Sequence, residues 1–120
     1  ISKITDKKAP KSKEYYVTVK NAGKIISCTA LMDTGNNLRE PFSDYPVIML
    51  DKELFNKLFT EDKIRLIPMS TVNGESVIKA FRPQKLIINN FSTDKVYIGE
   101  SITQLNEYKM ILNINLEGEL

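Results

Sequence analysis

The feature that most constrains the fold is a predicted β-hairpin that ends in the Asp-Thr-Gly triplet at residues 33–35. Residues 14–20 are rich in β-branched and aromatic side chains, and the Asn-Ala-Gly run at 21–23 supplies turn positions that tolerate positive φ. The second strand, residues 24–32, places Asp33 at its end. The hairpin therefore predicts a carboxylate held by a rigid element at the start of a loop, where functional side chains often lie.

The triplet resembles the active-site loop of an aspartic protease. Asp33 supplies a carboxylate, Thr34 a hydroxyl that can hydrogen-bond around the turn, and Gly35 a backbone that can pack closely against a partner. The same triplet is also an ordinary turn sequence. Its place after an apolar strand with a hairpin partner favours the catalytic interpretation.

The length of the chain bears on how such a site is completed. A chain of 120 residues has room for one domain with one core, and not for the two homologous lobes of a pepsin-like enzyme. Aspartic proteases use two carboxylates, whereas this chain has one Asp-Thr-Gly or Asp-Ser-Gly triplet. The resemblance thus implies that a second copy supplies the other Asp33 through a C2 homodimer.

The composition excludes several other catalytic mechanisms. The chain has no His, so Ser-His-Asp and Cys-His catalysis and His-based metal sites are excluded within it. Cys28 is the only cysteine, and its place in an alternating strand predicts a small buried hydrophobic side chain in a reducing compartment. Hydrolysis by carboxylates needs no metal and no other cofactor, and we expect none.

The charge distribution separates a basic segment from a near-neutral body. Residues 1–14 hold five lysines against two carboxylates, while the formal net charge of the chain is +2. The segment is typical of a linker on the cytoplasmic flank of a membrane span, and no apolar stretch of the chain approaches the length that a span needs. A body without a basic face argues against a nucleic-acid partner, and with it against a nucleic-acid-binding β-barrel.

A second hairpin is predicted after the triplet. Residues 63–69 and 76–81 read as strands, and Asn73-Gly74 between them is a strong turn signal. In the protease interpretation Val72, Asn73 and Gly74 form a flap that closes over the substrate. The alternative is a plain β-hairpin, and only its position after the triplet favours the flap.

The remaining elements are short. Asp51 can cap a helix over residues 52–59, whose apolar side chains share one core-facing side. Residues 116–120 are expected to be a frayed or truncated end. Further strands are predicted at residues 47–50, 84–88, 95–98 and 109–114. The chain is therefore expected to be mostly β, with one or two short helices.

The continuation of the triplet narrows the resemblance to one family. Residues 33–38 read Asp-Thr-Gly-Asn-Asn-Leu, which adds Asn36 to the loop, and residues 40–43 and 45–48 read Glu-Pro-Phe-Ser and Tyr-Pro-Val-Ile. This block resembles the sporulation sigma-E factor processing peptidases, membrane-anchored aspartic proteases of endospore-forming bacteria. The resemblance implies that residues 15–120 form a retropepsin-like (acid protease) domain, a closed β-barrel or sandwich.

The same resemblance implies partners and a location. The substrate would be the inactive precursor of a sigma factor, from which the homodimer removes the N-terminal pro-sequence. An activating signalling protein would act through an absent membrane half, and residues 1–14 would be the juxtamembrane linker. The domain would then lie at the cytoplasmic face of the cell membrane, at the mother-cell septum, and be soluble as an isolated fragment.

One residue departs from the retropepsin pattern. A glycine usually follows the late apolar strand and packs under the catalytic loop, whereas this chain has Asn113 there. The sequence leaves the local backbone geometry open. It also leaves open a different class of function, a noncatalytic β-domain that binds peptides or partner proteins and keeps the loop without the activity.

Overall fold

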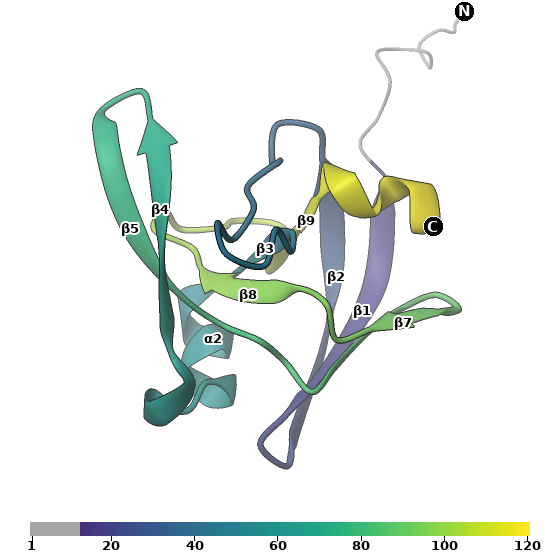
Figure 1. The fold of residues 1–120 in the computed structure, drawn as a ribbon. Helices are drawn as coiled ribbons and strands as arrows, with labels where there is room; N and C mark the ends of the chain where they lie inside the picture. Colours follow the sequence, from purple (N-terminus) through teal and green to yellow (C-terminus); the bar gives the residue numbers. More distant parts are fainter. Residues whose placement is uncertain (1–12) are drawn as a thin grey trace, which may run out of the picture.

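The computed structural model describes residues 13–120, which form one nine-stranded sheet with short helices (Figure 1). The predicted linker, residues 1–14, lies outside the described residues except for its last two, and Glu14 already begins the first strand. In chain order the elements are β1 (Glu14–Asn21), β2 (Lys24–Asp33), β3 (Val47–Leu50), α2 (Lys52–Leu58), η1 (Glu61–Lys63), β4 (Arg65–Thr71), β5 (Gly74–Phe81), β6 (Lys85–Ile88), β7 (Phe91–Thr93), β8 (Tyr97–Glu100), β9 (Met110–Asn113) and η2 (Ile114–Glu119).

The sheet is strongly mixed and unclosed. Its strand order is β4-β5-β8-β3-β9-β2-β1-β6-β7, so β4 and β7 are its two edges among the described residues. The prediction of a mostly β chain is confirmed, and the architecture is consistent with a retropepsin-like fold. Closure of the barrel is the part that differs. Pro68 in β4 has no N–H to donate and β7 has only three residues, so neither edge is suited to pair with the other.

The β1/β2 hairpin forms as its sequence predicts. Asn21 pairs with Lys24 across a two-residue turn in which Ala22 and Gly23 have φ of 53° and 76°. Positive φ at both turn positions matches the right-handed twist of the strands. Four apolar side chains that point inward from the two strands are fully or almost fully buried, namely Val17, Val19, Ala30 and Met32.

Helix α2 covers one side of this core. The Asp51 carboxylate accepts a hydrogen bond from the Glu53 backbone N–H at 3.1 Å, as a predicted N-cap should. Phe55 and Leu58 on its inner side are fully buried, which confirms the predicted core-facing side. In Figure 1 the helix lies low beside the base of the β4/β5 hairpin, whose free end projects away from the rest of the sheet.

The end of the chain is ordered, and the expectation of a frayed end was wrong. Residues 114–119 form the 3₁₀ helix η2, and Leu116 packs into the main core with 5% of its surface exposed. The Asn113 side chain caps this helix by accepting a hydrogen bond from the Asn115 backbone N–H. A short polar sequence shows no helical periodicity, so this tertiary contact was not visible in it.

We expect Leu116→Ala to lower the free energy of unfolding by about 2–5 kcal/mol, because a buried leucine loses its core contacts. The neighbouring exposed residue gives a matched control, since Glu117→Ala should change stability by less than about 0.5 kcal/mol. Urea unfolding of the two variants measures both. Equal, small effects would mean that the C-terminal helix does not pack on the core.

Candidate active site

Asp33 is the last residue of β2 and lies beside the end of a second, parallel strand. Strands β2 and β9 pair in parallel, and their register places Asp33 opposite Asn113. The strand residue before it, Met32, is almost fully buried, whereas Asp33 itself is exposed. The predicted carboxylate thus stands at the end of a strand whose nearby inward-facing residues, Ala30 and Met32, are buried, and it is accessible to another molecule.

The triplet folds back on its own carboxylate. The Gly35 backbone N–H donates to Asp33 Oδ1 at 2.9 Å, and the Asn36 N–H donates to the Asp33 carbonyl at 3.0 Å. A Cβ atom at position 35 would lie 3.3 Å from Asp33 Oδ1, closer than ordinary van der Waals contact. A side chain at position 35 would therefore require the Asp33 carboxylate to shift by a few tenths of an ångström. Thr34 is exposed beside it, and its predicted contact with a second copy stays a prediction.

Two asparagine side chains tie the loop to the strands beneath it. Asn36 Nδ2 donates to the carbonyls of Val47 and Leu112 at 3.1 and 3.2 Å, and Asn36 O accepts from the Ile114 N–H at 2.9 Å. Asn113 Nδ2 donates to the carbonyls of Leu38 and Val47 at 2.7 and 3.0 Å. The loop after Asp33 is thus held from below by side-chain amides.

The geometry at Asn113, which the sequence left open, is ordinary for a strand. Its φ and ψ are −99° and 135°, a conformation that any residue adopts, and its side chain is fully buried. The space under the loop is occupied by an amide that makes hydrogen bonds. Glycine's conformational freedom is not required at this position.

The predicted flap is the free end of the β4/β5 hairpin. Thr71 pairs with Gly74, so the turn centres on Val72 and Asn73, and Gly74 follows with φ of 114°. The Asn73 N–H donates to Thr71 Oγ1, which donates to the Gly74 carbonyl. Val72 is fully exposed at the tip. The Asn-Gly signal located the turn, with glycine supplying the positive φ just after it.

A groove of about 440 Å³ lies between the loop after Asp33 and strand β4. One side is formed by residues 35–39 of the loop, and the other by residues 68–70 of β4. The turn residues Val72 to Gly74 do not line it in this single chain. Three larger hollows, of about 470, 700 and 790 Å³, lie elsewhere and include no residue of the triplet.

Glu40, which the sequence singled out only as part of the block that carries the family resemblance, is a buried carboxylate that braces the loop. It is 1% exposed and accepts hydrogen bonds from Ser43 N–H and Oγ–H at 2.7 and 2.6 Å. Burial would raise the pKa of Glu40, but the hydrogen bonds from Ser43 and the Phe42 backbone, with the Arg65 charge, lower the pKa below its ordinary value. The one sequence signal for this hydrogen-bonded arrangement was a serine three residues after the glutamate.

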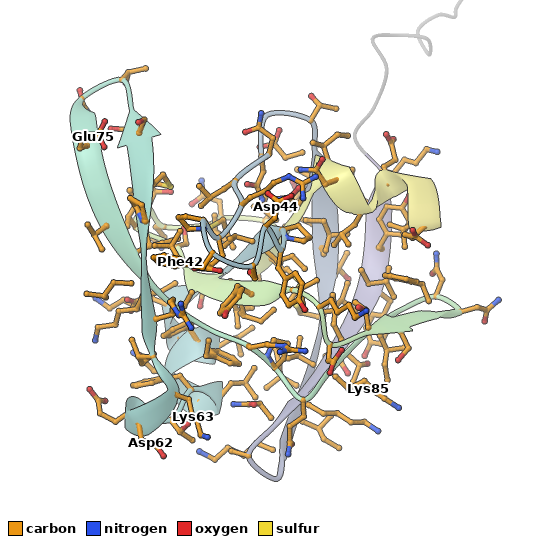
Figure 2. The ribbon with its side chains drawn as sticks, viewed as in Figure 1. Phe42, Asp44, Asp62, Lys63, Glu75 and Lys85 are labelled. Carbon is orange, nitrogen blue, oxygen red and sulfur yellow. The ribbon has the colours of Figure 1, made fainter. Side chains whose placement is uncertain are left out.

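Arg65 connects this loop to the base of the flap. It is the first residue of β4, and its guanidinium lies 3.5 Å from Glu40 Oε2. The same group lies 6.0 Å from the Phe42 ring centre and 5.9 Å from that of Tyr97. Figure 2 shows Phe42 beside the hairpin and Glu75 near its free end. Loop and flap therefore share one anchoring side chain.

The described residues also bear on metal binding, membrane crossing and thiol reactivity. Within residues 13–120 no cluster of three or more His, Cys, Asp or Glu side chains could hold a metal ion, and no helix is long and apolar enough to cross a membrane. Cys28 is half-buried against the main core, and burial, with a smaller effect of Asp51, raises the pKa of its thiol to about 11. The thiol therefore stays protonated at neutral pH, as expected for a packing side chain.

Glu40→Gln should lower the free energy of unfolding at neutral pH by about 1–3 kcal/mol, because the Ser43 donors and Arg65 lose a charged acceptor. The folded pKa of Glu40 lies below the ordinary value of 4.5, so its contribution is complete above that value and disappears as the pH falls through the folded pKa. Urea unfolding at neutral and acidic pH should show the difference shrinking in acid.

Glu75→Gln is the matched control for that experiment. Glu75 also accepts a hydrogen bond from a serine hydroxyl, that of Ser70 at 3.1 Å, but this pair is exposed. Its replacement should have little effect at either pH. A Glu40→Gln difference that did not change with pH would contradict the assignment of a buried, ionised Glu40.

Comparison with known proteins identifies the family. Residues 1–116 match the model of peptidase family U4, described as sporulation factor SpoIIGA. Over 119 residues the chain is 30% identical to a probable sporulation sigma-E factor-processing peptidase of Clostridium acetobutylicum. That alignment covers 96% of this chain and 41% of the relative, so the chain spans less than half of that protein's length. The chain therefore belongs to the sporulation factor SpoIIGA family of peptidases.

Proposed function

We propose that this domain is an aspartic endopeptidase that works as a homodimer and removes the N-terminal pro-sequence of a sporulation sigma factor precursor, pro-sigma-E. The observation that carries the proposal is Asp33, an exposed carboxylate at the end of an inner strand of the sheet, next to a groove between its own loop and β4. The family assignment and the relative's name support a processing peptidase. The substrate is inferred from that name.

The mechanism requires two copies of Asp33 at the dimer axis. Two carboxylates within hydrogen-bond reach share one proton, because two like charges at that separation cannot both remain ionised cheaply. The ionised one takes a proton from a water molecule, which attacks the scissile carbonyl carbon, while the protonated one donates a hydrogen bond to the carbonyl oxygen. The reaction proceeds without a covalent intermediate.

The other predicted site residues support this dyad. The Gly35 N–H orients one oxygen of Asp33, and Thr34 is exposed where it can brace the loop of the second copy. Val72, Asn73 and Gly74 form the flap tip, which closes over a peptide lying in the groove. Arg65 fixes the base of this hairpin to the loop through Glu40.

We further propose that the domain acts at the cytoplasmic face of the cell membrane, at the mother-cell septum. The alignment covers 41% of the relative, so the relative has a further region outside the matched part. In the proposal, residues 1–14 connect the protease domain to a membrane region of that kind. The lysines of that segment suit the anionic surface of a cytoplasmic leaflet. An activating signalling protein would act through the membrane region.

We expect Asp33→Asn and Asp33→Ala to reduce precursor cleavage by about 100-fold or more, because the proton transfers lose their carboxylate. Thermal unfolding should stay nearly unchanged, since Asp33 is exposed. Co-expression of the full-length protein with a sigma factor precursor, read by immunoblot, measures cleavage. Asp62→Asn on η1 is the control and should remain active. Cleavage by either Asp33 variant would remove this residue from the mechanism.

Dimeric action is tested by joining two copies of the domain through a flexible linker. Linkage raises the effective concentration of the second copy to about a millimolar, so the tandem should cleave precursor where the separate domains do not. A tandem with Asp33→Asn in one copy should be inactive, because one carboxylate cannot fill both roles. Activity of this mixed tandem would exclude a shared dyad. Precursor binding without cleavage by any tandem would favour the noncatalytic peptide-binding function.

A further inference from the structure

The Asn113 side chain forms hydrogen bonds with segments that lie far apart in the sequence. Its Nδ2 donates to the Leu38 and Val47 carbonyls at 2.7 and 3.0 Å. Its Oδ1 accepts from the backbone N–H and the Nδ2 of Asn115, both at 2.9 Å. One buried amide thus uses one proton on the loop after Asp33, the other on the first residue of β3, and its oxygen on the first turn of η2.

A second side-chain amide, that of Asn36, shares an acceptor with Asn113. Asn36 Nδ2 donates to the Val47 carbonyl as well, and to that of Leu112, the residue before Asn113. The Val47 carbonyl therefore accepts from both asparagines, while the Val47 N–H donates to the Leu38 carbonyl at 2.9 Å. Asn36 lies three residues after Asp33, so a shift of this loop would break several buried or partly buried hydrogen bonds together.

Asn113 also lies next to Asp33 itself, because the two residues are opposite each other in the β2/β9 register. Its backbone does not need the freedom of a glycine, since its φ is −99°. What this residue supplies is the side-chain amide. A methyl group or a hydrogen atom in its place would remove the donor that the loop carbonyl of Leu38 and the β3 carbonyl of Val47 share.

We propose that Asn113 is a positioning residue for Asp33, which holds the active-site loop in its working geometry through its two amide donors. The proposal rests on the proposed aspartic-protease function. It assigns the loop-ordering role to Nδ2, and to Oδ1 only the capping of η2. A misplacement of a reacting group by about 1 Å can cost a factor of 100 in rate, so loosening the loop should be seen in catalysis.

The test uses substitutions in the full-length protein that separate the role of the Asn113 Nδ2 donor from that of the Oδ1 acceptor. Asn113→Asp keeps an oxygen for Asn115 and loses both donors, and Asn113→Gly removes the side chain altogether. Both should lower kcat roughly 100-fold, with KM changing much less. Asn115→Ala removes only a bond on the η2 side and should keep kcat close to wild type.

A stability control accompanies these variants. Leu58→Ala opens a cavity under α2, away from the loop, and all proteins are assayed at a temperature where each is folded. If Leu58→Ala lowered kcat as much as Asn113→Asp does, the effect would be general destabilisation and the positioning role would be rejected. Wild-type kcat in Asn113→Gly would reject it as well, because that variant has the glycine of the retropepsin pattern.

A second measurement does not depend on activity. In the isolated domain, the side-chain NH₂ protons of Asn36 should exchange slowly with solvent by NMR, and in Asn113→Asp they should exchange at least tenfold faster. If the wild-type protein did not cleave any precursor, the proposed function would fail, while this exchange would still show whether Asn113 orders the loop. Unchanged exchange in Asn113→Asp would overturn the positioning role.

Discussion

The parallel pairing of β2 with β9 is the contact on which the rest of the site depends. It joins the first hairpin to the last strand of the chain, and its register sets Asp33 beside Asn113. Parallel strands are covered on both faces in most proteins, and here the buried residues of both strands contribute to the main core. Because the strands end together, the loop after Asp33 and the turn into η2 meet at the same edge, where amide side chains can link them.

The second constraint is the ion pair that connects the loop after Asp33 to the β4/β5 hairpin. Glu40 is buried in the loop, and Arg65 reaches it from the first position of β4. A charged carboxylate buried without donors would strongly destabilise the fold. Ser43 and Arg65 offset this cost at Glu40 by supplying hydrogen bonds and a positive charge. This arrangement sets the distance between the base of the hairpin and the loop, and so defines the groove between them. Asp33 itself remains exposed, as the proposed two-copy mechanism requires.

Sequence reasoning succeeded where the signals are local. The turn at Ala22 and Gly23, the Asp51 cap and the buried side of α2 are each determined by neighbours within a few residues. The sequence did not predict η2, a six-residue segment ordered by the packing of Leu116, or β7, a three-residue strand with no periodicity to detect. Closure of the barrel was also expected, whereas the strand order leaves β4 and β7 as edges, since a proline in one and the shortness of the other suit neither for pairing.

The sequence by itself determined the mostly β class, the position of Asp33 at the end of a strand, and the family, because these depend on alternation, turn residues and a contiguous motif. Only the tertiary structure decided how the loop is held. The Asn113 side chain reaches a carbonyl 75 positions away, and Arg65 reaches Glu40 from 25 positions away. Hydrogen bonds between such distant residues leave no period or spacing in the chain, since they exist only after the strands that carry them have paired.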